Sequence, residues 1–382
     1  MPDSRRVAIL TTGRQDYGLL RSTLLQMDDD GRLSRRLWVA GMHLNARFGQ
    51  TIKLIRDDHI TIDREVAFVG EPPDPLLDAS RALIEMGRAL EADRPAALLL
   101  TGDRSETLAA GVAATLVRVP IAHLHGGEET EGAIDNVCRH ALTKLSHLHL
   151  VSHETHARRV AQMGEDPTNI VVVGAPGLDN MYRQDLPDRT TLAGVLSMPL
   201  LPPLVLVTVH PTTLGDDPLL EVRSIAAAME NVEATYVVTQ PNADVGGEVI
   251  RDFWIGWSRG RARVQALDAL GVRMYWGLLK IVDAVLGNSS SGIIEAPAVG
   301  VPAVNVGDRQ RGRLRHPATL DVPPTAHAVE QGLRWALDRD TRERVRQIPS
   351  PYPPGPAAPR IVEALARWQP PVPPRKRFCD LL

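Results

Sequence analysis

The sequence predicts an α/β protein of two doubly wound domains that face a central cleft. Short apolar runs alternate with amphipathic segments from residue 7 to residue 306, the pattern of parallel strands joined by helices. The chain has 382 residues, a length that favours two domains. The alternation stops between residues 183 and 203, in a stretch rich in charge and proline that we interpret as a linker. A cleft between two such domains is the default place for a ligand.

The first half of the chain is expected to form the first sheet. Its predicted strands are 7–11, 37–41, 96–100, 121–124, 147–151 and 170–173. Its predicted helices begin near Asp16 and cover 51–57, 80–92, 108–116 and 137–145, with Ser80 as an N-cap.

The second half repeats the alternation, without a sequence repeat. Its predicted strands are 204–209, 234–239, 272–275, 281–286 and 303–306, with helices near 219–231, 247–259 and 292–298. We therefore divide the chain into a first domain (1–185), a second domain (186–348) and a proline-rich tail (349–382). The tail is predicted to contain a helix at 361–368. Its end, including the basic run 375–377, is expected to be solvated, with Phe378 and Leu381 as candidates for docking.

Composition excludes several classes of function. Lys plus Arg number 43 and Asp plus Glu number 46, a net charge of −3 that predicts no nucleic-acid partner. Aromatic residues make up only 4%, too few for stacking platforms. The two cysteines, Cys138 and Cys379, have no metal-ligand spacing and are expected to be reduced. With no signal-peptide pattern and no apolar run near ~20 residues, we predict a cytoplasmic protein with no membrane partner.

The densest group of titratable residues lies between residues 101 and 144. Two apolar runs, 96–100 and 119–124, lead directly into it, and the carboxyl ends of parallel strands line a crevice. A solvated charged loop is the alternative, but it would not need so many such groups beside a double glycine. The titratable residues are Asp103, Arg104, Glu106, His125, Glu128, Glu129, Glu131, Asp135, Arg139, His140 and Lys144.

A phosphate site is predicted after the strand that ends at residue 286. Gly287 turns the chain, and Ser289–Ser291 then lie at a helix start, where N–H groups and hydroxyls favour an anion. An ordinary N-cap is the alternative, but it would need one serine, not three; Arg309, after the next strand, also favours a phosphate. Glu295, one turn into the helix, suits the two hydroxyls of a ribose, with a favourable charge near the helix start as the competing role.

Two further strand ends carry candidate phosphate contacts. His210 follows the strand 204–209, and Arg14 follows Gly13 after the first strand. The sequence contains neither G-x-G-x-x-G nor G-x-x-x-x-G-K-[ST], which argues against nicotinamide-dependent dehydrogenases and P-loop NTPases.

In combination, these motifs resemble one family, the hydrolysing UDP-N-acetylglucosamine 2-epimerases of sialic- and legionaminic-acid pathways, within the GT-B superfamily. The resemblance covers roughly residues 5–335. The motifs are RQDY at 14–17, GMHLNARFG at 41–49, GDRSE at 102–106, HGGEETEGAID at 125–135, RHALTK at 139–144, HP at 210–211, PNAD at 241–244, NSSSGIIEAP at 288–297 and VGDRQRGR at 306–313.

The resemblance implies a GT-B-like pair of Rossmann-like domains, a nucleotide-sugar substrate, a homodimer or homotetramer, and neither a metal nor another cofactor. It implies that the final helix packs on the first domain. The implied catalytic residues are Asp103, His125, Glu128 and Asp135, and the implied substrate-binding residues are Arg14, His43, His210, Asn242, Ser289, Ser290, Glu295 and Arg309. His125 stands where many members have a catalytic glutamate, and a histidine can both donate and accept a proton near neutral pH.

The reaction implied by the resemblance is anti-elimination of UDP across C1–C2 of UDP-N-acetylglucosamine, followed by addition of water to give N-acetylmannosamine. Two alternatives stay open. A related enzyme of a small-molecule pathway would cleave a different glycosyl diphosphate or use an acceptor other than water. A binding module would keep the nucleotide-sugar site and lack the chemistry, although it would not need the carboxylates Asp103, Glu128 and Asp135.

Overall fold

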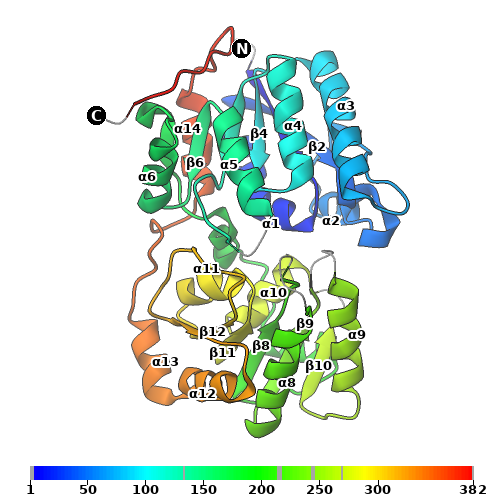
Figure 1. Cartoon of the computed structure of the whole chain (residues 1–382), viewed down its shortest axis with the longest axis vertical. Coiled ribbons are helices and arrows are strands. Elements are labelled where there is room, and N and C mark those ends of the chain that lie inside the picture. The colour runs from blue at the N-terminus through cyan, green and yellow to red at the C-terminus, as the bar shows by residue number, and fades with distance from the viewer. Residues whose placement is uncertain (1–3, 132–133, 213–216, 242–245, 268–269, 381–382) are drawn as a thin grey trace. The chain divides into compact units, whose positions relative to one another are not determined.

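The computed structural model consists of two compact units, each built on its own parallel sheet (Figure 1). It describes residues 4–131, 134–212, 217–241, 246–267 and 270–380. Unit 1 comprises Met1–Glu128, Asp135–Asp179 and Tyr352–Leu382, and unit 2 comprises Glu129–Ile134 and Asn180–Pro351. Two doubly wound α/β sheets confirm the predicted fold class.

Unit 1 contains a seven-stranded sheet in the order β3-β2-β1-β4-β5-β6-β7. All neighbouring strands run parallel. The strand order reverses between the adjacent strands β1 and β4, which makes their carboxyl ends a topological switch point. The strands are β1 (Arg5–Thr11), β2 (Leu33–Ala40), β3 (Arg64–Val66), β4 (Ala97–Thr101), β5 (Ile121–Leu124), β6 (Leu148–Val151) and β7 (Ile170–Val172).

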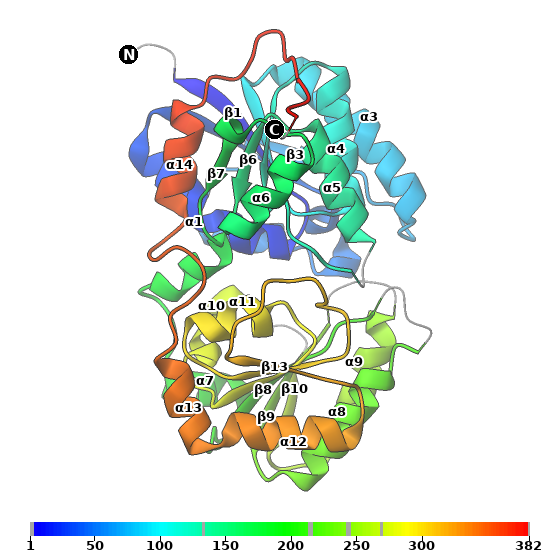
Figure 2. The same ribbon diagram turned by 60° about the vertical axis from the view of Figure 1, so that its left-hand side comes forward.

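Helices cover both faces of this sheet because successive side chains of a strand point to opposite faces. Val7 and Ile9 of β1 belong to a core shared with α1, α2 and α14, whereas Ala8 and Leu10 belong to a core shared with α3, α4 and α5. The helices are α1 (Arg14–Asp30), α2 (Ile52–Asp57), α3 (Pro75–Asp93), α4 (Ser105–Leu116), α5 (Asp135–Leu145), α6 (Glu154–Gln162) and α14 (Ala358–Arg367). The last of these, α14, packs beside α1 (Figure 2).

Unit 2 contains a six-stranded parallel sheet in the order β10-β9-β8-β11-β12-β13. Its switch point lies between β8 and β11. The strands are β8 (Leu204–Thr208), β9 (Thr235–Thr239), β10 (Val264–Leu267), β11 (Ala284–Gly287), β12 (Ala303–Val306) and β13 (Thr319–Val322). The helices are α7 (Arg189–Leu196), α8 (Leu220–Asn231), α9 (Gly247–Ser258), α10 (Gly271–Leu279), α11 (Ser291–Ala298), α12 (Ala326–Leu337) and α13 (Arg339–Arg346).

Three local predictions are wrong. Residues 272–275 lie in α10 and not in a strand, because the apolar pattern continues through Trp276, Leu278 and Leu279 at helical spacing. Residues 189–196, within the predicted linker, form α7. Ser80 lies inside α3, whose N-cap is Asp74; its carboxylate accepts from the N–H groups of residues 76 and 77 at 3.0 Å.

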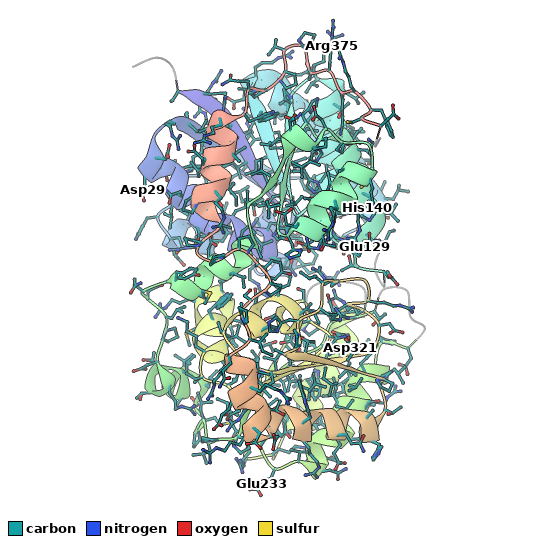
Figure 3. The ribbon with its side chains drawn as sticks, turned by 90° about the vertical axis from the view of Figure 1, so that its left-hand side faces the viewer. Asp29, Glu129, His140, Glu233, Asp321 and Arg375 are labelled. Carbon is teal, nitrogen blue, oxygen red and sulfur yellow. The ribbon has the colours of Figure 1, made fainter. Side chains whose placement is uncertain are left out.

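The end of the chain contacts unit 1 through Lys376, Phe378 and Cys379, so the expectation of a solvated end is wrong for Lys376 and Cys379, whereas Phe378 docks as one of the two named candidates. The Lys376 ammonium lies 2.6 Å from Glu165 and donates to the carbonyls of residues 143, 144 and 146 at the end of α5. The Phe378 ring lies 5.1 Å from the Lys144 ammonium, and the Cys379 N–H donates to the Gly164 carbonyl. Arg375 projects away from the unit, as predicted (Figure 3), whereas Leu381 lies outside the described residues.

The remaining expectations from composition concern cysteines, membranes and metals. Cys138 and Cys379 are both free. Among the described helices, none is long and apolar enough to span a bilayer. Over the same residues, no three or more His, Cys, Asp or Glu side chains converge as metal ligands would.

Candidate active site

In each unit, predicted site residues follow the two strands that flank the switch point. In unit 1, Arg14 comes after β1 and Asp103 after β4. In unit 2, His210 comes after β8 and Ser289 after β11. Ligands of open α/β sheets bind beyond the carboxyl ends of strands at such points. The fold therefore delivers both predicted clusters to positions where a ligand is expected.

The turn that carries Arg14 is held by Asp16. Its carboxylate accepts from the N–H of Thr12 at 3.1 Å and from the Thr12 hydroxyl at 2.7 Å, which fixes the start of α1 where Gly13 offers no capping side chain. Burial lowers the pKa of Arg14. No carboxylate in the described part of the chain pairs with its guanidinium. A buried cation without a counter-charge is costly, so the position favours an anionic ligand.

His43 supports the same turn. It is fully buried, and its ring nitrogens lie 2.9 Å from the Thr11 hydroxyl and 2.8 Å from the Thr51 hydroxyl. Burial lowers the pKa of His43 to about 4, so the ring is neutral at physiological pH. Both nitrogens are thus engaged inside unit 1, and direct contact with a ligand through either would require one of these bonds to break.

Arg139 contacts the Asp103 side chain and the backbone of Glu128, two residues predicted to be catalytic. Its guanidinium pairs with the Asp103 carboxylate and donates to the Glu128 carbonyl at 2.9 Å. Arg139 is buried, whereas the Asp103 side chain keeps about a quarter of its surface accessible. Asp135 begins α5 one turn before Arg139. Arg139 was predicted to belong to the polar cluster, but no role was predicted for it. Its place in the RHALTK motif was the feature of the sequence that pointed to it.

His125 is held in an unusual conformation beside Glu128. Its backbone φ is +70°, in the left-handed region that a residue with a Cβ seldom adopts. Its Nδ1 atom lies 2.7 Å from Glu128 Oε1, which also accepts the Ser152 hydroxyl at 2.8 Å. The His125 Nε2 atom is buried and has no hydrogen-bond partner among the described residues. A buried, unpartnered nitrogen on a strained residue is typical of a functional site.

In unit 2, Asn288 holds the predicted phosphate contacts together. Its side chain accepts from the His210 N–H at 2.7 Å and donates to the His210 carbonyl at 2.9 Å. Arg309 donates to the carbonyls of Pro211 and Asn288. His210 and Arg309 therefore belong to one cluster around Asn288. The sequence analysis missed Asn288, although it stands in the NSSSG motif.

The serines after β11 leave donors free. Ser290 is the N-cap of α11 but makes no side-chain capping bond, and the Ser289 hydroxyl accepts from the Ser291 N–H at 3.3 Å. Across the described residues, the N–H groups of Ser289 and Ser290 have no acceptor. Free N–H groups at a helix start favour a phosphate. This arrangement supports an anion site over an ordinary cap.

Glu295 lies one turn into α11, and the residue as a whole is intermediate in solvent exposure. Burial of the carboxyl raises the pKa of Glu295 to about 7, although a hydrogen bond with the Ser291 side chain opposes the shift. The group is therefore poised between its neutral and ionised forms near physiological pH. A ribose that donates two hydroxyl protons would favour the ionised form.

We predict that Glu295→Gln stabilises the ligand-free protein at pH 8 but not at pH 5. A carboxyl with a raised pKa in the folded state stabilises fully below its unfolded pKa, and this stabilisation is lost as pH rises through about 7. The difference between the pKa of Glu295 in the folded state and its pKa in the unfolded state corresponds to roughly 3 kcal/mol of unfolding free energy at most. Urea unfolding at both pH values measures it, with Glu343→Gln on exposed α13 as the control. Equal pH dependence in wild type and E295Q would contradict the prediction.

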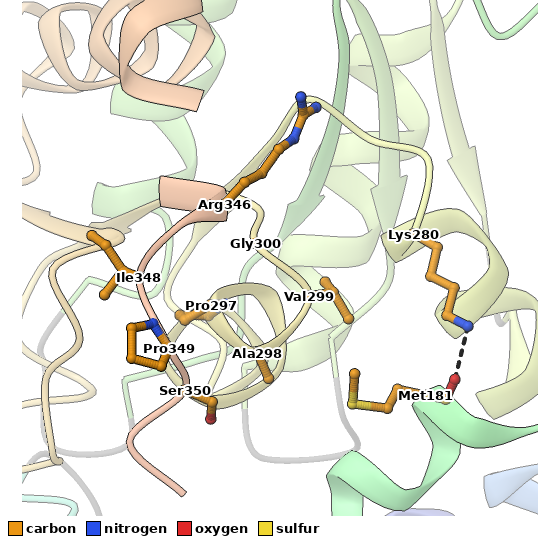
Figure 4. Close-up of a pocket in the computed structure, with 10 residues that line it drawn as sticks. All are labelled: Met181, Lys280, Pro297, Ala298, Val299, Gly300, Arg346, Ile348, Pro349 and Ser350. Atoms are coloured by element: carbon orange, nitrogen blue, oxygen red, sulfur yellow. Dashed lines mark hydrogen bonds between the residues drawn. The ribbon is translucent and has the colours of Figure 1, made fainter. Parts of the chain in front are cut away.

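One predicted site residue and one observed pocket do not belong to the two clusters. Asn242 lies outside the described residues. A separate pocket of unit 2 lies between the end of α11 and the segment after α13 (Figure 4). None of the predicted site residues lines it, and the Lys280 ammonium beside it donates to the Met181 carbonyl at 2.7 Å. We therefore keep the two switch-point clusters as the candidate site.

Two doubly wound parallel sheets, each with predicted site residues at its switch point, define a protein of the GT-B fold class. Solved structures share this fold: a putative UDP-N-acetylglucosamine 2-epimerase from Listeria monocytogenes matches with a TM-score of 0.80, 17% identity and coverage of 95% of this chain and 96% of that one. The UDP-GlcNAc 2-epimerase of Neisseria meningitidis, solved with UDP-GlcNAc bound, matches with a TM-score of 0.80, 16% identity and coverage of 94% and 99%.

The sequence comparison identifies the family. The family model described as UDP-N-acetylglucosamine 2-epimerase matches residues 25–366. The chain therefore belongs to the UDP-N-acetylglucosamine 2-epimerase family and is an epimerase, which confirms the resemblance seen in the motifs.

Two curated relatives cover most of the chain. UDP-N,N'-diacetylbacillosamine 2-epimerase (hydrolyzing) of Legionella pneumophila is 34% identical over 345 residues, 88% of this chain and 89% of the relative. GDP/UDP-N,N'-diacetylbacillosamine 2-epimerase (hydrolyzing) of Campylobacter jejuni is 32% identical over 323 residues, 83% and 84% of the two chains.

Proposed function

We propose that the protein is a hydrolysing 2-epimerase of a UDP-linked 2-acetamido sugar. The observation that carries the proposal is that unit 1 holds, after two neighbouring strands, a partly exposed carboxylate, Asp103, and a histidine, His125, whose Nε2 atom is free within the described part of the chain. They follow β4 and β5, which are neighbours in the sheet. One acid and one base at adjacent strand ends suit a reaction that removes the C2 proton on one face of the sugar and returns a proton to C2 on the other face. The names of the two relatives above support hydrolysis.

The proposed reaction has two stages. A base removes the C2 proton, the C1–O bond breaks, and its electron pair leaves with UDP to give a 1,2-unsaturated sugar. Water then adds its hydroxyl to C1 while a proton returns to C2 on the opposite face. Asp103 and His125 are proposed to exchange these protons, with Glu128 supporting His125 and Asp135 contributing from the start of α5.

The nucleotide diphosphate is proposed to bind to cationic and N–H donors. Arg14 supplies a guanidinium that no described carboxylate pairs with, and Ser289 and Ser290 supply free N–H groups, all of which stabilise charge as UDP departs. His210 and Arg309 complete the set, and Glu295 accepts the ribose hydroxyls. Asn242 remains a proposed contact, while His43 acts by holding the turn before Arg14.

The first candidate substrate is UDP-N-acetylglucosamine, whose epimerases include a Neisseria meningitidis relative at 29% identity over 316 residues. A second candidate is UDP-N,N'-diacetylbacillosamine, whose sugar carries two N-acetyl groups. The similarity to the Legionella and Campylobacter relatives, at 34% and 32% identity, favours testing it in parallel.

The test is turnover of both UDP sugars, and of their GDP counterparts, in deuterated water with mass detection. We expect release of the nucleoside diphosphate and a free 2-epimeric sugar that carries one deuterium at C2. A free sugar without deuterium would exclude elimination. Product formation only when an acceptor other than water is supplied would favour the related glycosyl-diphosphate-cleaving enzyme.

A further inference from the structure

A hydrogen-bonded row of four side chains runs from His125 into the interior of unit 1. Glu128 Oε1 lies 2.7 Å from His125 Nδ1 and 2.8 Å from the Ser152 hydroxyl, and the Ser152 hydroxyl lies 2.9 Å from His156 Nδ1. We call His125, Glu128, Ser152 and His156 the relay. Its members come from three separate segments: the loop after β5, the residue that follows β6 and the first turn of α6.

The relay is buried and closely packed. Glu128, Ser152 and His156 are 5%, 1% and 4% exposed, and the His125 side chain is 11% exposed. The Arg159 guanidinium donates to the Gly127 carbonyl, and a Cβ on Gly127 would lie only 2.5 Å from the His156 carbonyl oxygen. Close packing of α6 against the double-glycine loop thus leaves the relay little freedom to rearrange.

The chemistry of the four groups fixes the direction of every hydrogen bond. An ionised Glu128 only accepts, so the Ser152 hydroxyl donates to it, and His156 must then donate its Nδ1–H to Ser152. For the same reason, His125 donates its Nδ1–H to Glu128. The neutral His125 ring therefore carries its lone pair on Nε2, the atom without a partner among the described residues.

We propose that Ser152 and His156 are positioning residues that act through Glu128 to hold His125 with Nε2 as its proton-accepting atom. The inference rests on the proposed function and names residues that the function itself did not require. The imidazolium that forms when Nε2 takes a proton is stabilised by Glu128, as a buried carboxylate stabilises the histidine of a hydrolase triad. Burial holds the pKa of His156 at about 4, so His156 stays a neutral donor and does not compete for the charge of Glu128.

The first test is kinetic. Ser152→Ala and His156→Phe are each expected to lower kcat about 10- to 100-fold with little change in KM, the range for losing a hydrogen bond to a charged group. Without the Ser152 donor, Glu128 is no longer held against His125 and stabilises its imidazolium less, so the acidic limb of the rate profile is expected to move to lower pH in S152A. Other titratable groups beside the relay are the same in all variants; they are His123, Arg139, His153 and Arg159.

Three matched variants separate positioning from general damage. Ser152→Thr keeps the hydroxyl, and His156→Asn keeps an N–H near the position of Nδ1, so both are expected to stay within about threefold of wild type in kcat. Ser146→Ala removes another buried hydroxyl of unit 1, which donates to the Leu142 carbonyl and does not touch the relay. Equal kcat and equal pH profiles in S152A, H156F and S146A would overturn the proposal.

The second test does not depend on turnover. Nitrogen-15 NMR of labelled histidines in the wild-type protein reports the tautomer of His125, assigned by comparison with His125→Gln. The relay predicts a proton on Nδ1 and a lone pair on Nε2, and a neutral ring with the proton on Nε2 would overturn it. If no nucleotide sugar is turned over but the tautomer is as expected, the proposed function fails and the relay geometry stands. If nucleotide sugars are turned over but the proton lies on Nε2, the relay fails and the proposed function stands.

Discussion

Asp103→Asn is expected to lower kcat by about 10²- to 10⁴-fold while leaving UDP affinity within about threefold of wild type. The substitution keeps the size of the side chain and one hydrogen-bond acceptor but removes the carboxylate that would exchange a proton with the sugar. UDP affinity should persist because the proposed diphosphate contacts are Arg14, His210, Arg309 and the serine N–H groups. Steady-state kinetics and calorimetric titration with UDP provide the two measurements.

The same substitution leaves Arg139 without a full counter-charge, so folding must be measured alongside activity. Arg139 is buried, and removing one partner of a buried pair destabilises a protein. Assays well below the thermal midpoint avoid this effect. Asp28→Asn changes a half-exposed carboxylate that pairs with Arg35 in the same unit; it is the control and should leave kcat unchanged. A D103N enzyme with near-normal kcat would remove Asp103 from the proposed chemistry.

Gly287→Ala is expected to destabilise unit 2 by about 4 kcal/mol or more, enough to abolish soluble expression or UDP binding. Gly287 ends β11 with a φ of +138°, and a Cβ there would lie 2.0 Å from the Thr208 carbonyl oxygen. Thr208 belongs to β8, which pairs with a strand on each side and so cannot move away. The glycine thus lets two central strands approach closely before the chain turns into the serine cluster.

Gly260→Ala provides the matched control for this prediction. Gly260 also has a positive φ, +75°, but no atom lies within 4 Å of the Cβ position. Its substitution should cost only the backbone penalty of about 1 kcal/mol. Thermal unfolding and UDP titration of both variants separate the clash from the penalty. Similar losses in G287A and G260A would show that the close approach to Thr208 has no energetic consequence.

The fold was predictable because parallel strands buried on both faces appear in sequence as short, nearly continuous apolar runs. The runs at 121–124 and 303–306 were placed with the observed bounds. Short apolar runs misled the prediction in two places. The apolar residues 272–275 were predicted as a strand but lie in α10, and the strand Val264–Leu267 was not predicted. Short apolar runs do not distinguish a strand from one face of a helix.

The candidate site was predictable where its residues follow strands. It was not predictable where residues distant in sequence contact one another. Asp103, His125 and Ser289 each stand within three residues of the end of an apolar run, so periodicity pointed to them. Ser152 and His156 lie 24 or more positions from Glu128 in sequence. Only the adjacency of β5 and β6 brings Ser152 into contact with Glu128, and His156 contacts Ser152 in turn. No pattern in a single sequence encodes such a pairing, and the same holds for Lys376 against the end of α5.

Unit 1 is assembled from three separate stretches of chain, the last of which is Tyr352–Leu382. During synthesis, α14 and residues 376–379 emerge only after all of Asn180–Pro351 has left the ribosome. Unit 2 can therefore fold before unit 1 has all of its segments. Anyone who wishes to express unit 1 alone would therefore have to graft residues 352–380 behind residue 179. A fragment that ends at the linker would expose the apolar face of α1 to solvent, and the carbonyls at the end of α5 would lack the ammonium of Lys376.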